Sequence, residues 1–201
     1  METVGHKVAC VGASITYGQT LGNREEECYP AVLQRLLGSG YEVRNFGRSG
    51  AGIWHGGYAP YTITEEYKNA VAYGAEIIIV CLGTNDVIYL TDHHLEDELV
   101  SDYKSLLDDL TEHSPENAKV LQAKIPPVPC MFKDDDKPVQ VINKAVEITA
   151  NEFGAELLDF YEPFRTREGL FSDGVHPNKD GAELIAIMVY NRLKEIGAVL
   201  E

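Results

Sequence analysis

The run Ile77-Ile78-Ile79-Val80-Cys81, which continues through Leu82 into Gly83-Thr84-Asn85-Asp86, decides the fold class. Its first five residues are apolar, without the alternation that marks a half-exposed strand. A short apolar run that ends in a turn of small and polar residues is typical of a central strand in a parallel sheet, where helices cover both faces. The sequence therefore predicts a buried strand over 77–81 with a polar loop directly after it.

Four similar short runs lie on either side of this strand in the sequence. They contain many β-branched and other apolar residues and occupy 7–11, 41–45, 119–123 and 156–159. Amphipathic stretches separate the five runs, over 30–37, 65–73, 95–110, 139–153 and 179–196. Alternating strands and helices predict an α/β fold, a three-layer α/β/α sandwich with a five-stranded, flavodoxin-like parallel sheet. Because the chain has 201 residues and no internal repeat or linker, one domain over 1–201 is expected.

Composition excludes several classes of partner. The net charge is −15, with 32 acidic and 17 basic residues, and such a surface repels nucleic acid and anionic membranes. The first residues lack the basic start of a signal peptide, and no apolar stretch approaches the roughly 18 residues of a membrane span. We therefore expect a soluble, cytoplasmic protein and leave its oligomeric state open. The four cysteines are far apart and predict neither a zinc site nor a disulfide scaffold.

The segment Gly12-Ala13-Ser14-Ile15-Thr16-Tyr17-Gly18 follows the first predicted strand and presents a hydroxyl group. The segment is neither a dinucleotide-binding loop nor a P-loop, because it contains neither GxGxxG nor a glycine-lysine pair before serine or threonine. The nucleophile elbow G-x-S-x-G does not match either, because Thr16 stands where its second glycine would be. Taken alone, Ser14 is an ordinary turn serine.

The segment Asp173-Gly174-Val175-His176-Pro177 precedes the last predicted helix and brings a carboxylate and an imidazole within one turn. A carboxylate that accepts from imidazole Nδ1 fixes the tautomer and leaves Nε2 able to take a proton from a serine. Pro177 suits an early helical position. The alternative is that Asp173 and His176 only cap this helix and satisfy each other.

Two further loops carry hydrogen-bond donors at the same edge of the predicted sheet. Asn85 follows the strand over 77–81, and Gly50 lies in the glycine-containing loop after the strand over 41–45. A side-chain amide and backbone N–H groups can together stabilise the oxyanion that forms during acyl transfer. The simpler interpretation is that each loop is merely a turn.

At this point the chain resembles the SGNH hydrolase superfamily, the GDSL-like lipases and acylhydrolases. Four of the family's motifs occur here in order: a serine block, a glycine block, Gly-x-Asn-Asp and Asp-x-x-His. The resemblance implies a triad of Ser14, Asp173 and His176 and an oxyanion hole formed by Ser14, Gly50 and Asn85. It also implies a two-step acyl transfer that needs no metal or organic cofactor. The chain departs from the family's Gly-Asp-Ser, because Ala13 replaces the aspartate that supports the nucleophile loop.

Other residues are candidates for substrate binding or for a metal site. Trp54 and Thr84 are expected to contact substrate, and Trp54 could form an aromatic wall with His55, Tyr58 and Tyr61 or simply cover the sheet edge. The cluster Asp92, His93, His94, Glu96 and Asp97 resembles a metal site, but it lacks the i, i+4 spacing of a helical ligand pair. We interpret it as a solvated helix start. No metal site is predicted.

The expected substrate is a small ester with a short acyl group, most readily an acetyl ester of a carbohydrate. The acidic surface lacks a basic amphipathic helix for lipid interfaces, and the segment 125–132 contains three prolines that would make it a fixed wall rather than a lid. A thioesterase or a lysophospholipase remains the alternative within the enzyme class. Outside that class, the alternative is a binding module for carbohydrate or nucleotide that has no catalytic activity.

Overall fold

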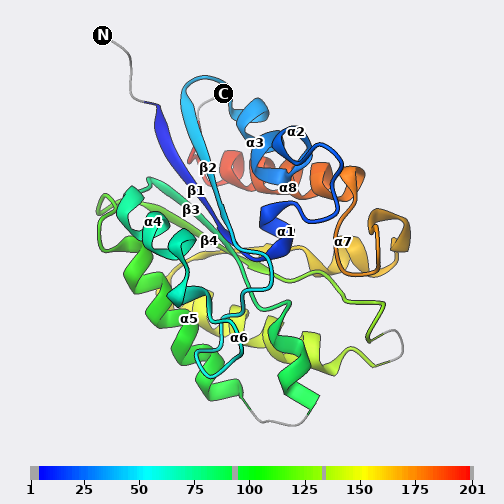
Figure 1. The fold of residues 1–201 in the computed structure, drawn as a ribbon. Helices are drawn as coiled ribbons and strands as arrows, with labels where there is room; N and C mark the ends of the chain where they lie inside the picture. The colour runs from blue at the N-terminus through cyan, green and yellow to red at the C-terminus, as the bar shows by residue number, and fades with distance from the viewer. Residues whose placement is uncertain (1–4, 92–94, 133–134, 200–201) are drawn as a thin grey trace.

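The computed structural model describes residues 5–91, 95–132 and 135–199. Five parallel strands form one sheet in the order β2-β1-β3-β4-β5, as Figure 1 shows for its first four members. The strands are β1 (His6–Gly12), β2 (Tyr41–Gly47), β3 (Ile77–Cys81), β4 (Lys119–Lys124) and β5 (Glu156–Asp159). The predicted α/β class and the five-stranded parallel sheet are confirmed.

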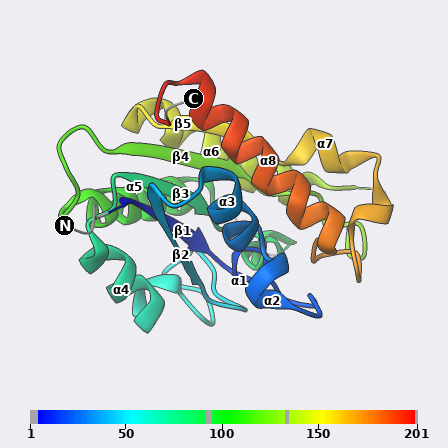
Figure 2. The ribbon, with the colours of Figure 1, turned by 90° about the horizontal axis from the view of Figure 1, so that it is seen from above.

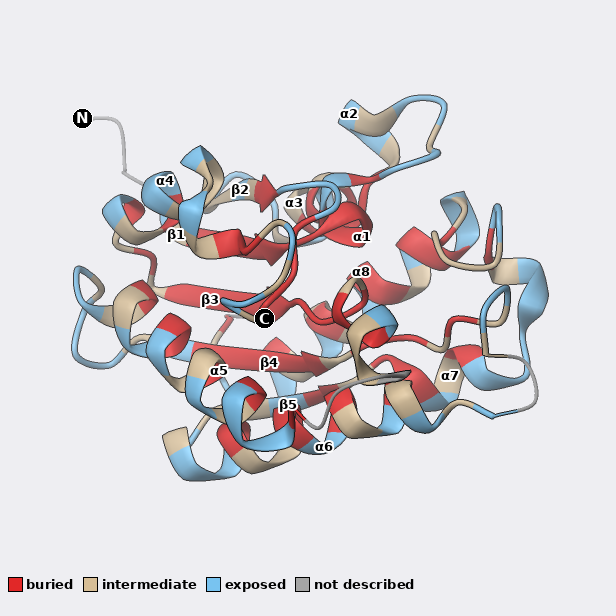
Figure 3. Cartoon of the chain, turned by 60° about the horizontal axis from the view of Figure 1, so that its bottom comes forward, coloured by how far each residue is buried: buried red, intermediate tan, exposed pale blue. Residues whose placement is uncertain are grey.

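Helices cover both faces of the sheet (Figures 1 and 2). One face carries α3 (Tyr29–Leu37) and α8 (Lys179–Glu195), and the other carries α4 (Glu65–Tyr73), α5 (Glu96–Thr111) and α6 (Lys137–Phe153). Every residue of β3 is buried, because side chains that alternate along this strand enter two different apolar clusters. Figure 3 shows this burial in the strands and on the inner sides of the helices. The arrangement is the three-layer sandwich that the sequence predicts.

The five long helices lie within two residues of their predicted bounds at either end. Helix α4 begins after Thr64, whose side chain accepts a hydrogen bond from Tyr67 N, and it ends at Gly74 in the left-handed conformation. Helix α6 begins two residues earlier than expected, because Pro138 occupies its first turn, where a missing N–H costs nothing. The short segments that the sequence pattern did not reveal are α1 (Ser14–Tyr17), α2 (Arg24–Glu27), α7 (Tyr161–Arg165), η1 (Tyr61–Ile63), η2 (Asp86–Thr91) and η3 (Glu168–Leu170).

Strand order determines where a ligand can bind. The chain order reverses between β1 and β3, which are neighbours in the sheet although β2 lies between them in the sequence. In open α/β sheets the crevice outside the carboxyl ends of two such strands is the usual binding place. Gly12, the last residue of β1, is paired with Gly47 of β2 and Cys81 of β3. The loops after these three strands therefore start side by side.

Within the described residues, no helix combines the length and the apolar character that crossing a membrane requires.

Candidate active site

Ser14 is the first residue of α1, directly beyond the carboxyl end of β1. Its side chain is almost completely buried, with 4% exposed. The approach to this turn requires glycine at position 12, because a Cβ there would lie 2.6 Å from the carbonyl oxygen of Cys81. The backbone thus turns tightly beside β3 and holds the serine at the edge where the loops after β1, β2 and β3 meet.

The turn that carries Ser14 is supported from β2 rather than from position 13. Asn45 Nδ2 donates to Thr16 O at 2.8 Å, and Asn45 Oδ1 accepts from Gly47 N at 2.8 Å. A Cβ on Gly47 would lie 2.2 Å from Tyr17 N, so α1 rests directly on the end of β2. Ala13 is buried in the same apolar cluster as Ala51 and Ile53. These contacts order the turn without the aspartate that the family usually has at position 13.

Asp173 and His176 meet within one turn, as their spacing predicts. Asp173 Oδ1 accepts from Val175 N at 3.0 Å and from His176 N at 2.8 Å. Its other oxygen, Oδ2, lies 2.7 Å from His176 Nδ1. Gly174 makes the turn possible, since it adopts φ +83° and a Cβ there would lie 2.7 Å from Cys130 Cβ. The carboxylate therefore orders both the turn and the imidazole ring.

The far nitrogen of the same imidazole reaches the serine. His176 Nε2 lies 3.0 Å from Ser14 Oγ, although 162 positions separate the two residues in the sequence. The alternative that Asp173 and His176 only cap α8 is wrong, because the N-cap is Asn178, whose side chain accepts from Gly181 N. Pro177 correspondingly lies before the helix, not in its first turn.

The charge state of Asp173 follows from these contacts. Partial burial alone would raise the pKa of its carboxyl, but the His176 ring bond, the backbone N–H bonds from His176 and Val175, and the charge of His176 outweigh that effect. The net result is a pKa below the usual aspartate value. Asp173 is thus ionised at neutral pH and accepts from Nδ1–H, which leaves Nε2 as the basic nitrogen facing Ser14.

Gly50 and Asn85 lie on the two loops beside Ser14. Gly50 is exposed and adopts φ +83°, a conformation that glycine tolerates without strain. Asn85 Nδ2 donates to Ala51 O at 2.8 Å, so the amide is anchored to the Gly50 loop. Both residues line the same cavity as His176. The structure therefore brings Gly50 and Asn85 to the same cavity as His176, whose ring also contacts Asp173 and Ser14.

This cavity has a volume of about 400 Å³ and is largely apolar. Trp54 and Thr84, the expected substrate contacts, both line it. Of the other proposed wall residues, Tyr58 lines the cavity and is 96% exposed, whereas Tyr61 is fully buried and donates to Phe46 O at 2.6 Å. His55 is absent from the cavity lining and pairs with Asp102. The aromatic wall thus consists of Trp54 and Tyr58 together with Tyr89, which the sequence did not single out.

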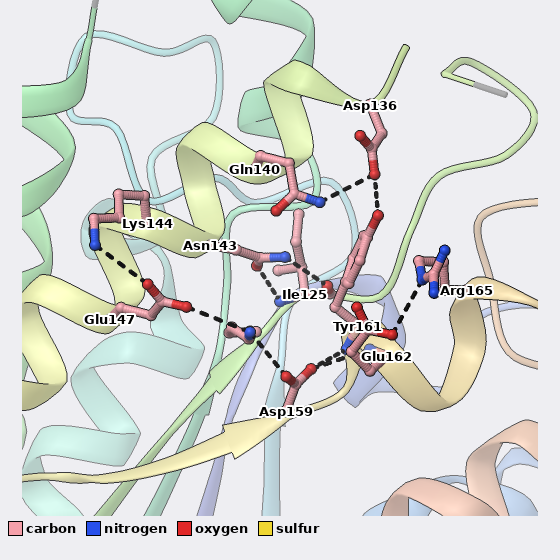
Figure 4. Close-up of polar contacts among 11 residues, drawn as sticks. Ile125, Asp136, Gln140, Asn143, Lys144, Glu147, Asp159, Tyr161, Glu162 and Arg165 are labelled. Carbon is pink, nitrogen blue, oxygen red and sulfur yellow. Dashed lines mark hydrogen bonds and ion pairs between the residues drawn. The ribbon is translucent and has the colours of Figure 1, made fainter. Parts of the chain in front are cut away.

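The proline-containing segment 125–132 also lines the cavity, through Val128 and Met131. Its start is anchored by Asn143, whose side chain accepts from Ile125 N at 2.8 Å and donates to Ile125 O at 3.3 Å (Figure 4). Further along, Tyr161 donates to Asp136 at the start of α6. Val128 and Met131 thus contribute a wall of the cavity as expected, and the rigidity of the segment stays a prediction.

Asp86 is the residue whose role the sequence did not reveal. It is fully buried, and its two carboxylate oxygens accept from Ile53 N and Trp54 N, each at 2.9 Å. Burial is the largest effect on the pKa of this carboxyl and raises it. The nearby Asp102 raises the pKa as well, whereas the backbone N–H groups lower it, and the net result is a raised pKa. Its place in Gly-x-Asn-Asp is the one feature of the sequence that points to Asp86. Its partners could not be predicted, because they are backbone N–H groups, which every residue except proline has.

The segment that resembled a metal site can be described only in part. Asp92, His93 and His94 lie outside the described residues. Glu96 and Asp97 occupy the first turn of α5, where acidic side chains are favourable. Among the residues that the structure describes, no group of three or more His, Cys, Asp or Glu side chains could hold a metal ion.

The chain is similar in sequence to known proteins. A model of the GDSL-like Lipase/Acylhydrolase family matches residues 10–184. An acetylxylan esterase of Xylanibacter ruminicola is 29% identical over an alignment of 206 positions that covers 94% of this chain, but the chain spans only 43% of that relative's length.

Solved structures share the fold. A lipolytic protein of the G-D-S-L family from Veillonella parvula has a TM-score of 0.73 at 16% identity, with 94% of this chain and 99% of that chain covered. A carbohydrate acetylesterase from Sinorhizobium meliloti has a TM-score of 0.70 at 17% identity, with 95% and 99% covered.

Proposed function

The chain belongs to the GDSL-like lipase/acylhydrolase family, and on this premise we propose that it is a serine ester hydrolase that removes short acyl groups, chiefly acetyl, from carbohydrate esters. The observation that carries the proposal is the row of hydrogen bonds from Asp173 through His176 to Ser14. A hydroxyl, an imidazole and a carboxylate in this order suit the roles of nucleophile, base and orienting group in acyl transfer. A binding module would have no need to keep them aligned beside a cavity.

The first half of the proposed reaction acylates Ser14. His176 Nε2 takes the hydroxyl proton while Ser14 Oγ forms a bond to the carbonyl carbon of the ester. The carbonyl oxygen becomes an oxyanion and accepts hydrogen bonds from the Asn85 amide and from the N–H groups of Gly50 and Ser14. The bond between carbon and the alcohol oxygen then breaks, and the alcohol leaves with the proton from His176.

The second half restores the enzyme. A water molecule gives a proton to His176 Nε2 and attacks the acyl carbon, which again produces an oxyanion at the same three donors. The bond from Ser14 Oγ to carbon breaks, the carboxylic acid leaves, and the proton returns from His176 to Ser14. Asp173 keeps its charge throughout and stabilises the imidazolium that forms in each half.

Three observations support a carbohydrate ester as substrate. Trp54 and Tyr58 offer flat faces at a cavity of about 400 Å³, and aromatic faces of this kind suit sugar rings. The net charge of −15 disfavours anionic lipid surfaces. The relative from X. ruminicola is an acetylxylan esterase. A longer acyl chain is the competing substrate, because Ile88 and Met131 add partly exposed apolar side chains to the same cavity.

The test compares acyl length and alcohol type in one series. kcat/KM is measured on p-nitrophenyl acetate, butyrate, octanoate and palmitate, and acetate release is followed from acetylated xylo-oligosaccharides. Acetate is expected to be the best acyl group, with release from the sugar. A preference for octanoate or longer without release from sugar would refute the carbohydrate substrate but not the serine hydrolase.

Two serine variants distinguish hydrolysis by this protein from hydrolysis by a contaminating enzyme. Ser14→Ala is expected to lose nearly all activity, because no other group replaces the nucleophile. Ser114→Ala makes the same chemical change in the turn after α5, where the hydroxyl donates to Leu110 O, and should keep wild-type activity. Loss of less than about 90% of kcat in Ser14→Ala would refute the assignment of the nucleophile.

A further inference from the structure

Asp86 combines complete burial with a position directly after the proposed oxyanion donor Asn85. The side chain faces the loop that follows β2, and it accepts from two consecutive backbone N–H groups there, those of Ile53 and Trp54. One carboxylate thus holds the backbone of a neighbouring loop at two adjacent points. No step of the proposed reaction uses this carboxylate.

Three of the hydrogen bonds between the two loops that carry the proposed oxyanion donors lie close to those donors. Two are the bonds to Asp86, each 2.9 Å long, and the third runs from Asn85 Nδ2 to Ala51 O at 2.8 Å. Ala51 directly follows Gly50, so all three bonds lie within four residues of the Gly50 N–H. Together they fix where this N–H lies relative to the Asn85 amide.

The arrangement is costly enough to need a reason. Burial disfavours the charged form of a carboxylate, and the burial of Asp86 accordingly raises the pKa of its carboxyl group. The neighbouring loop is also constrained, because a Cβ on Gly52 would lie 2.6 Å from Asp86 Oδ1. A neutral side chain could accept from one of the two N–H groups with a single oxygen, whereas a carboxylate accepts from both.

We propose that Asp86 is a positioning residue that sets the distance between the Gly50 N–H and the Asn85 amide, so that both reach the same oxyanion. The inference rests on the proposed function and deepens it. An oxyanion hole stabilises charge only if its donors are held in place before the reaction. Asp86 acts through these donors and does not touch the substrate's reacting atoms.

The test uses Asp86→Asn, which keeps the shape but points an amide N–H₂ at one of the two backbone donors. Active sites are counted with a fluorophosphonate that labels Ser14, and kcat and KM are measured on p-nitrophenyl acetate. Labelling is expected to remain stoichiometric, while kcat per labelled site falls about 10- to 100-fold with little change in KM. The shape of the pH–rate profile should not change, because Asp86 does not contact His176.

Two further variants keep the test decisive. Gly52→Ala pushes on the same carboxylate from the opposite loop and should also lower kcat per labelled site, so it replaces Asp86→Asn if that variant does not fold. Asp102→Asn is the matched control, because Asp102 anchors the same loop at His55 N, at 2.8 Å, away from both donors. It should keep kcat within about threefold of wild type, because the amide oxygen of the new side chain can still accept from His55 N.

The outcomes are distinct. If Asp86→Asn and Gly52→Ala both keep kcat per labelled site within threefold of wild type, Asp86 has no positioning role. If Asp102→Asn loses as much as Asp86→Asn, the loop responds as a whole and the specific role of Asp86 is refuted. If wild-type protein neither reacts with the fluorophosphonate nor hydrolyses p-nitrophenyl acetate, the proposed function fails, and this inference fails with it.

Discussion

Replacing Asp173 by asparagine tests the direction of proton transfer through the imidazole. In wild type, Asp173 Oδ1 accepts from the backbone N–H groups of Val175 and His176, while Oδ2 faces His176 Nδ1 at 2.7 Å. Two donors hold the position of Oδ1, so the carbonyl oxygen of the new amide should take that place. Its N–H₂ group then takes the place of Oδ2 and points a donor at Nδ1.

The consequence for catalysis follows from tautomers. With a donor facing it, Nδ1 must accept, and the ring proton moves to Nε2, which lies 3.0 Å from Ser14 Oγ. A protonated Nε2 cannot take the serine proton, so the base is lost although every atom keeps its place. This kind of change in a Ser-His-Asp triad lowers kcat by about 10⁴-fold. The factor corresponds to about 5.4 kcal/mol of transition-state stabilisation.

The assay is kcat on p-nitrophenyl acetate at pH 8, paired with thermal unfolding. Asp173→Asn should unfold close to the wild-type temperature, since it keeps the two backbone bonds of the turn. Asp173→Ala is the comparison, because it loses those bonds as well and should unfold at a lower temperature. A kcat for Asp173→Asn within tenfold of wild type would show that the carboxylate does not set the tautomer, and the reasoning would be wrong.

Three further predictions concern single side chains. Asn85→Ala should lower kcat roughly 10²- to 10³-fold with little change in KM, because its donor serves the transition state; an effect on KM alone would make Asn85 an ordinary substrate contact. Burial raises the pKa of Asp86, so the folded protein binds more protons than the unfolded chain from about pH 4 up to that raised pKa, and stability falls as pH rises through this window. From pH 4 to pH 7 the free energy of unfolding of wild type should therefore fall relative to that of Asp86→Asn, which has no carboxyl group to titrate at this position. Urea titrations at both pH values measure the two free energies, and a difference between the two proteins that stays the same at both pH values would contradict the raised pKa. Of the four cysteines only Cys130 is exposed, so a thiol reagent should modify one group in the native protein and four after unfolding. The reaction with Cys130 should be slow, because partial burial of the thiol and the charge of Asp173 raise its pKa. Rapid modification of two or more groups in the native protein would refute the burial of the other three cysteines.

The fold was predictable from the sequence wherever a segment has a clear period. Strand β3 has its predicted bounds, because five apolar residues in a row are unambiguous in a chain whose other segments are amphipathic. Helix α4 also has its predicted bounds, because Thr64 and Gly74 mark its two ends. Helices of four or five residues, such as α1 and α7, have no period to detect, since they are hardly longer than one turn.

The site was predictable to the extent that its contacts are local or follow from the sheet. Asp173 and His176 lie three positions apart, so their meeting could be inferred from spacing alone. The contact between His176 and Ser14 spans 162 positions and follows only from the rule that loops at the carboxyl ends of parallel strands converge. Tyr61 was a wrong candidate for the aromatic wall of the cavity, because its ring is buried in the core. The sequence alone does not show whether the ring of a loop tyrosine faces a cavity or the core.

The substitution of Ala13 for the family's aspartate shows why a motif is a weaker guide than the contacts that replace it. From the sequence, losing this carboxylate predicts a looser nucleophile turn. In the structure, the Asn45 side chain donates to Thr16 O and the close approach of Gly47 seats α1 on β2. A buried carboxylate does occur nearby, but it is Asp86, and its partners lie on the loop of Gly50 rather than on the loop of Ser14. The contacts that order the Ser14 turn therefore come from β2, so Asn45→Ala should displace Ser14 more than any change at position 13 that keeps a small side chain.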